Sequence, residues 1–173
     1  MQILNSSGAD AVGLDIEPLN NKGTAVIKGD ARSMPFKDSS FDAVITILVL
    51  PHICEVQKVI CEMKRVIKNE GRILVVLFNK SLLNFPAYMA IRLGIRKMGY
   101  EYIKYYSLKD AKRLFQQAGF KVTRTYTTNF HPPLLGPLLA KFFSQHDNFC
   151  LHCPMVNGQG RLLILEASLE KSR

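Results

Sequence analysis

The chain has 173 residues, 47% of them hydrophobic, which suits a single domain over residues 1–173 with an apolar core. Its 23 Lys and Arg outnumber its 14 Asp and Glu and give a net charge of +9, which favours an anionic or amphipathic partner. Four cysteines are too few for a disulfide scaffold, and no run of about 18 apolar residues predicts a transmembrane segment. The first residues lack the pattern of a secretory signal, so we expect a cytoplasmic protein.

The first half of the chain alternates strand-like and helix-like segments, which predicts an α/β domain with a mainly parallel sheet. Short strands are expected at residues 11–16 and 24–28. Residues 41–50 form a nearly continuous apolar run rich in β-branched side chains, which is typical of a buried central strand.

Residues 55–67 have the spacing of a helix with one apolar face. The apolar stripe consists of Val56, Val59, Ile60, Met63 and Ile67. Cys54 and Cys61, seven residues apart, share a helix face in this scheme and are expected in the core. Gly71 is expected to end the helical region with a positive φ, and residues 72–78 then form the next buried strand.

The second half of the chain contains a clear helix start. Ser107 as N-cap and Asp110 three residues later occupy the positions of a capping box. This helix is expected to end at Ala118-Gly119, where the glycine follows the last apolar residue. Strands are expected to follow at residues 120–126 and 162–167.

Residues 131–160 form the least regular part of the chain and contain four of its eight prolines. The apolar stretch PPLLGPLLAKFF is predicted to be a packed helix, with a lid or a surface contact as the alternatives. Cys150 and Cys153 with His146 suggest soft metal ligands, but a zinc site usually needs two such pairs. We therefore predict no metal site.

Two carboxylates follow predicted strands at a spacing of fifteen residues. Ligands of open α/β sheets bind at the carboxyl ends of the strands, where Asp15 and Asp30 lie. Asp15 could accept hydrogen bonds from both hydroxyls of a ribose. Asp30 could accept one from an exocyclic amine while the next backbone N–H donates to a ring nitrogen. Together the two acids predict a site for adenosine.

Several segments resemble class I S-adenosylmethionine-dependent methyltransferases of the small-molecule group called type 11. The resembling segments are VGLDIEP, GDARSMPFKDSSFDAVITILVLPHI, VICEMKRVIKNEGRILVVLFN and YYSLKDAKRLFQQAGFKV. The resemblance implies a Rossmann-like methyltransferase fold, with a mainly parallel sheet and antiparallel C-terminal strands. It also implies S-adenosylmethionine as the cofactor and methyl transfer to a small-molecule acceptor, of which lipids and quinone-like compounds are examples.

The resemblance also assigns cofactor-binding residues. It implies the ribose position for Asp15 with Ile16, the adenine position for Asp30 with Ala31, and positions beside the methionine part for Thr46 and Ile47. No catalytic residue is assigned, because the sulfonium of the cofactor is already a good leaving group. His52 lies where the family frequently has a histidine and is a candidate general base, with a role in lining the pocket as the alternative.

The chain departs from the family pattern before Asp15. The family's first strand and its glycine-rich loop belong there, and Ser6-Ser7-Gly8 is a poor substitute. We therefore expect an N-terminally shortened domain whose first strand is missing or degenerate. The strands at residues 11–16 and 44–50 must then pair with each other, pair with a second chain or stay exposed. A homodimer, or a partner that completes the sheet, follows from the second option.

Two alternative functions remain open. A non-catalytic methyltransferase-like protein acting through a partner is favoured by the missing glycine-rich loop and disfavoured by Asp15 and Asp30. Nucleic-acid binding or methylation is suggested by residues 92–124, which contain nine Lys and Arg but only two acidic residues. No RNA-binding module or Asn-Pro-Pro-Tyr-like signature accompanies these charges, so a nucleic-acid partner is the weaker expectation.

Overall fold

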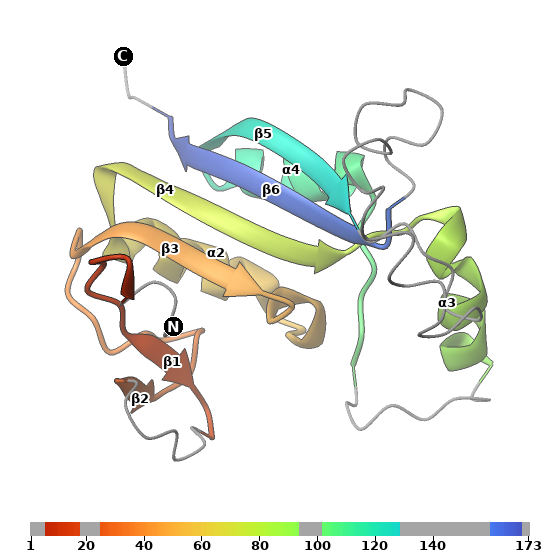
Figure 1. The fold of residues 1–173 in the computed structure, drawn as a ribbon, viewed down its shortest axis with the longest axis horizontal. Coiled ribbons are helices and arrows are strands. Elements are labelled where there is room, and N and C mark those ends of the chain that lie inside the picture. The colour runs from red at the N-terminus through yellow and green to blue at the C-terminus, as the bar shows by residue number, and fades with distance from the viewer. Residues whose placement is uncertain (1–5, 18–24, 94–101, 129–159, 171–173) are drawn as a thin grey trace.

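The computed structural model describes residues 6–17, 25–93, 102–128 and 160–170 (Figure 1). The elements in chain order are β1 (Gly13–Asp15), β2 (Val26–Lys28), β3 (Phe41–Ile47), the 3-10 helix η1 (Leu50–His52), α2 (Val56–Val66), β4 (Ile67–Phe78), the 3-10 helix η2 (Leu82–Asn84), α3 (Phe85–Arg92), α4 (Leu108–Gln117), β5 (Phe120–Thr128) and β6 (Leu162–Leu169).

The strands form two separate sheets. Strands β1 and β2 pair in parallel as a small sheet of their own. The larger sheet has the order β3-β4-β6-β5, in which β3 and β4 are parallel and β6 is antiparallel to both of its neighbours. The expected combination of parallel strands with antiparallel C-terminal strands is therefore confirmed.

The two sheets do not join through β1 and β3. Each of these strands is hydrogen-bonded on one side only among the described residues, because β1 pairs with β2 and β3 pairs with β4. The expectation of a buried central strand at residues 41–50 is therefore wrong for the described residues, because β3 lies at the edge of its sheet and its Ile45 and Ile47 side chains are 42% and 63% exposed. Of the three outcomes expected for these strands, pairing with each other is excluded.

Helices α2 and α4 cover one face of the larger sheet (Figure 1). The alternation along β4 and β6 follows from this, because every second side chain of a strand points to the covered face. The fully buried apolar side chains of these two strands are Ile67, Ile73, Val75, Leu77, Leu163, Leu165 and Ala167. The helices add Val56, Val59, Ile60 and Met63 of α2 and Ala111 and Phe115 of α4 to this core.

The start and end of α4 are confirmed. The Ser107 hydroxyl accepts a hydrogen bond from the backbone N–H of Asp110 at 3.1 Å and donates to the Asp110 carboxylate at 2.7 Å. These contacts satisfy one of the backbone donors that a helix leaves unpaired at its N-terminus. Gly119 has a φ of +85°, which suits a residue without a side chain directly after the helix.

Two expectations about the region of α2 are wrong. Cys54 precedes the helix, and Cys61 lies outside its buried stripe, so both thiols are exposed instead of being in the core. Gly71 does not have a positive φ and lies within β4, which begins at Ile67. A Cβ on Gly71 would come within 3.0 Å of the Asp42 carbonyl oxygen, so the position requires glycine for space.

Some predictions fall outside the described residues. The stretch PPLLGPLLAKFF and the cysteines Cys150 and Cys153 are among them. Within the described residues, no helix has the length and apolarity needed to cross a membrane. In the same part of the chain, no three His, Cys, Asp or Glu side chains are grouped so that they could hold a metal ion.

Candidate functional site

The structure places Asp15 and Asp30 at the carboxyl ends of two neighbouring strands. Strands β1 and β2 are parallel, with Asp15 opposite Lys28. The backbone N–H of Gly29 donates to the carbonyl oxygen of Asp15 at 2.9 Å, so the two chains stay paired up to the residue before Asp30. The two acids are therefore brought to the same edge of the small sheet, as the sequence predicted.

Asp15 is exposed, and one of its two carboxylate oxygens accepts a hydrogen bond from within its own turn. Its Oδ1 atom accepts a hydrogen bond from the backbone N–H of Glu17 at 2.9 Å, while Oδ2 makes no hydrogen bond to another described residue. An ionised carboxylate can accept about four hydrogen bonds. Asp15 therefore has acceptor capacity for a diol. The adjacent Ile16 side chain is 59% exposed and offers an apolar surface beside it.

Asp30 has a close basic partner in Arg32. The guanidinium of Arg32 contacts both carboxylate oxygens, with Nη2 at 2.7 Å from Oδ2. The hydrogen bonds from the Arg32 side chain hold the pKa of Asp30 below its ordinary value. The carboxylate is thus ionised at neutral pH and acts only as a hydrogen-bond acceptor.

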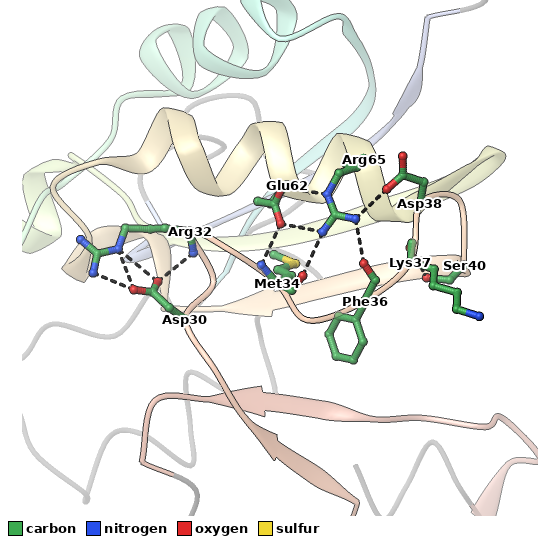
Figure 2. Close-up of polar contacts among 9 residues, drawn as sticks. All are labelled: Asp30, Arg32, Met34, Phe36, Lys37, Asp38, Ser40, Glu62 and Arg65. Atoms are coloured by element: carbon green, nitrogen blue, oxygen red, sulfur yellow. Dashed lines mark hydrogen bonds and ion pairs between the residues drawn. The ribbon is translucent and has the colours of Figure 1, made fainter.

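The segment that carries Asp30, the β2–β3 loop (residues 29–40), is fixed to α2 by Arg65 (Figure 2). The Arg65 guanidinium donates to the carbonyl oxygens of Met34 at 2.9 Å and Phe36 at 2.7 Å and to the Asp38 carboxylate at 2.7 Å. Two loop carbonyl groups and one carboxylate are therefore satisfied by one side chain.

Glu62 holds both Arg65 and the loop in place. Its carboxylate accepts Arg65 Nε at 2.8 Å and Nη2 at 2.7 Å, and it also accepts the backbone N–H of Met34 at 2.7 Å. The hydrogen bonds from Arg65 lower the pKa of Glu62 below its ordinary value. Ala31 and Met34 pack against the core, so the first part of the loop is anchored by polar and apolar contacts together.

Thr46 and Ile47 lie at the carboxyl end of β3 but on opposite faces of the sheet. Thr46 pairs in register with Val75, which is fully buried on the helix-covered face. The Thr46 hydroxyl is buried there and has no hydrogen-bond partner among the described residues. Ile47 points the other way and is exposed. A ligand at this edge would therefore meet Ile47 more readily than the Thr46 hydroxyl.

His52 lies just beyond this edge, in η1. Its Nδ1 atom is 3.3 Å from the carbonyl oxygen of Tyr102, and because a carbonyl group only accepts, Nδ1 carries the proton in this hydrogen bond. The ring packs edge-on against Phe78, with centroids 5.9 Å apart, and Phe78 in turn contacts the Tyr105 ring at 5.5 Å. His52 thus belongs to an aromatic cluster at the carboxyl ends of the parallel strands β3 and β4.

Arg32 and Arg65 were not predicted from the sequence. Arg65 contacts residues 27 to 31 positions away, and such partners cannot be identified from the local pattern of a helix. Arg32 lies only two residues after Asp30, so its contact with that carboxylate had a local signal in the sequence. What no local pattern indicates is its second contact with Glu55, 23 residues away.

Comparisons with known proteins agree with this fold. Residues 1–75 match a family model described as a methyltransferase domain. Protein MJ0638 of Methanocaldococcus jannaschii is 32% identical over 141 residues, which are 77% of this chain and 56% of that protein. Demethylmenaquinone methyltransferase of Tropheryma whipplei is 26% identical over 164 residues, covering 76% of this chain and 67% of the enzyme.

A solved structure extends the similarity to nearly the whole chain. A SAM-dependent methyltransferase from Archaeoglobus fulgidus matches with a TM-score of 0.68 over 96% of this chain and 79% of its own, at 14% identity. The fold is thus that of Rossmann-like methyltransferases, and the N-terminal part of the chain is similar to the methyltransferase domain that the family model describes. The chain spans about half the length of the first relative, MJ0638.

Proposed function

We propose that the protein transfers a methyl group from S-adenosylmethionine to a small molecule in the cytoplasm. The observation that carries this proposal is the placement of Asp15 and Asp30 at the same edge of two paired parallel strands. An adenosine moiety needs acceptors for its ribose hydroxyls and for its exocyclic amine, and one carboxylate at each strand end supplies them. Ala31, Ile16, Thr46 and Ile47 complete the proposed cofactor site.

The proposed acceptor is an apolar, lipid-like or quinone-like compound. Support comes from the aromatic cluster of His52, Phe78 and Tyr105 beside the exposed Ile47, because rings and branched side chains favour a planar apolar ligand. The similarity to a demethylmenaquinone methyltransferase points in the same direction. His52 is the proposed proton acceptor if the acceptor group must lose a proton.

A second candidate is a methyltransferase-like protein that acts through a partner. Within the part of the chain that the structure describes, β1 and β3 each have an unpaired edge, and an additional strand or a second copy of the chain would satisfy their backbone groups. Nucleic-acid binding through residues 92–124 is supported only by charge, including Lys109, Lys112 and Arg113 along α4.

The test is calorimetric titration of the full chain with S-adenosylhomocysteine. We expect the wild-type chain to bind and the Asp15→Ala variant to bind about tenfold or more weakly, because a hydrogen bond to a charged group is worth roughly 1.5–3 kcal/mol. Asp42→Ala is the matched control, since it removes the same charge from an exposed carboxylate that pairs with Lys68 at the opposite end of β3. Circular dichroism confirms that each variant is folded.

Absence of binding by the folded wild-type chain would contradict the proposed function. A negative titration together with a self-associated chain in sedimentation would favour the second candidate. Binding that is lost in Asp15→Ala but kept in Asp42→Ala would support the adenosine site, and a screen of quinone-like acceptors would follow.

A further inference from the structure

Arg32 occupies the acceptor positions of Asp30, the carboxylate proposed to receive the adenine amine (Figure 2). Asp30 Oδ1 is approached by the Arg32 backbone N–H at 2.8 Å and by Nε at 3.1 Å. Asp30 Oδ2 is approached by Nε at 3.0 Å and by Nη2 at 2.7 Å. A carboxylate has about four acceptor positions, and three N–H groups of a single neighbouring residue already use most of them, with the Nε–H shared between the two oxygens. An incoming amine must displace part of this set.

Arg32 also has a second acidic partner. Its Nη1 atom donates to Oε2 of Glu55 at 2.9 Å, directly before the first residue of α2. Glu55 is itself held by Lys58 at 2.5 Å, and its side chain makes no capping hydrogen bond to the helix. The guanidinium therefore spans from the end of β2 to the start of α2, and it keeps a charged acceptor even when it leaves Asp30.

From this arrangement we infer that Arg32 is a specificity-determining latch at the adenine end of the site. It holds the Asp30 carboxylate in the free protein and transfers to Glu55 alone when an exocyclic amine binds Asp30. The inference rests on the proposed function, because it needs the nucleoside to bind at Asp30.

The proposed latch distinguishes purines by the substituent at position 6 of the ring. A 6-amino group is a donor and bonds Asp30 only after Arg32 has withdrawn. A 6-oxo group is an acceptor and bonds the Arg32 guanidinium where it stands. The two residues thus select opposite hydrogen-bonding patterns, and the balance between them sets the preference for adenine.

The expected effects are modest because the residues are accessible. The side chains of Arg32, Asp30 and Glu55 are 43%, 36% and 44% exposed. An exposed ion pair of this kind changes a competing equilibrium by no more than about fivefold.

The experiment compares two ligands that differ at this position, S-adenosylhomocysteine and S-inosylhomocysteine, by calorimetric titration of the full chain. Removing Arg32 in Arg32→Met is expected to tighten S-adenosylhomocysteine binding by about three- to fivefold and to weaken S-inosylhomocysteine binding by about threefold. The control Lys28→Met removes an exposed cation from the same strand end and should change neither affinity. A residue that only supports the fold would shift both ligands in the same direction.

A second variant tests the transfer to Glu55. In the wild-type background, Glu55→Gln should weaken S-adenosylhomocysteine binding by about twofold, because Arg32 loses its alternative charged partner. In the Arg32→Met background the same substitution should have no effect, so the two changes are coupled.

Each outcome separates the latch from the proposed function. If the wild-type chain binds S-adenosylhomocysteine but Arg32→Met leaves both ligands unchanged or shifts them together, the latch is wrong and the proposed function stands. If no folded variant binds either ligand, both are wrong. Opposite shifts of the two ligands in Arg32→Met establish the latch.

Discussion

The two sheets of this protein differ in what holds them together. The four-stranded sheet is covered by α2 and α4, and its strands β4 and β6 supply fully buried side chains to the core. Strands β1 and β2 have three residues each and supply none of the fully buried core, and Ile27 of β2 is 40% exposed. The acids proposed to bind the cofactor therefore lie on the less buried sheet.

This difference shows how the position of Asp30 is maintained. Packing fixes the four-stranded sheet, whereas the small sheet depends on the β2–β3 loop that connects it to the rest of the domain. That loop is fastened to α2 by Arg65 and Glu62 through charged hydrogen bonds. We therefore expect the two sheets to respond very differently to substitution.

The largest effect on the free energy of unfolding is expected from a loss of packing. The same substitution, Leu→Ala, is compared in the two sheets. Leu165→Ala in β6 should lower the free energy of unfolding by about 3 kcal/mol, because Leu165 is fully buried and leaves a cavity. Leu14→Ala in β1 should cost about 1 kcal/mol or less, because Leu14 is only half-buried. Urea unfolding followed by circular dichroism measures both. Equal losses would mean that the two sheets form one cooperative core.

An intermediate effect is expected for the loop clamp. Arg65→Met should lower the free energy of unfolding by about 2 kcal/mol, since it removes the guanidinium that donates to the Phe36 carbonyl and that pairs with the Glu62 carboxylate. Arg72→Met is the control, because Arg72 is 75% exposed and lies 3.4 Å from Glu166. Such a surface pair contributes close to zero. A similar loss in both variants would show that the clamp has no special role.

The smallest effect expected here concerns pH. The pKa of Glu62 is lowered in the folded protein by its hydrogen bonds to Arg65, so its ionised form stabilises the fold. This stabilisation is present above the unfolded pKa of about 4.3 and is lost as the pH falls through the lower folded pKa. Glu62→Gln should therefore flatten the decline in urea midpoint below about pH 4.3, and an unchanged slope would contradict this account.

Elements with a strong local signal could be predicted from the sequence. All five residues of the predicted stripe are buried, although Ile67 is the first residue of β4 and not part of α2. The Ser107 cap starts α4 at the predicted position. The acids Asp15 and Asp30 could be placed at strand ends because a strand followed by an acid is a short-range pattern. Their roles in cofactor binding remain predictions.

Features that depend on the assembled fold could not be predicted. The register with Val75 turns the Thr46 hydroxyl toward the helices, which no local pattern indicated, and the place of Thr46 beside a ligand stays a prediction. Gly71 looked like a helix stop, whereas the nearby carbonyl of Asp42 gives the reason for the glycine. Cys54 was misjudged because α2 begins only at Val56, and Cys61 because it lies outside the buried stripe of the helix.

The strand order has a consequence for biosynthesis. Strand β6 pairs with both β4 and β5, yet it is the last of the described strands to leave the ribosome. Until β6 emerges, β4 has an open edge and β5 has no neighbour in the described sheet. The apolar side chains of β4 and β5 that pack against β6 in the finished fold then stay in water. A nascent chain that has been synthesised only as far as β5 therefore exposes strand edges that can pair with other nascent chains and lead to aggregation. Completion of the sheet is a late event in synthesis.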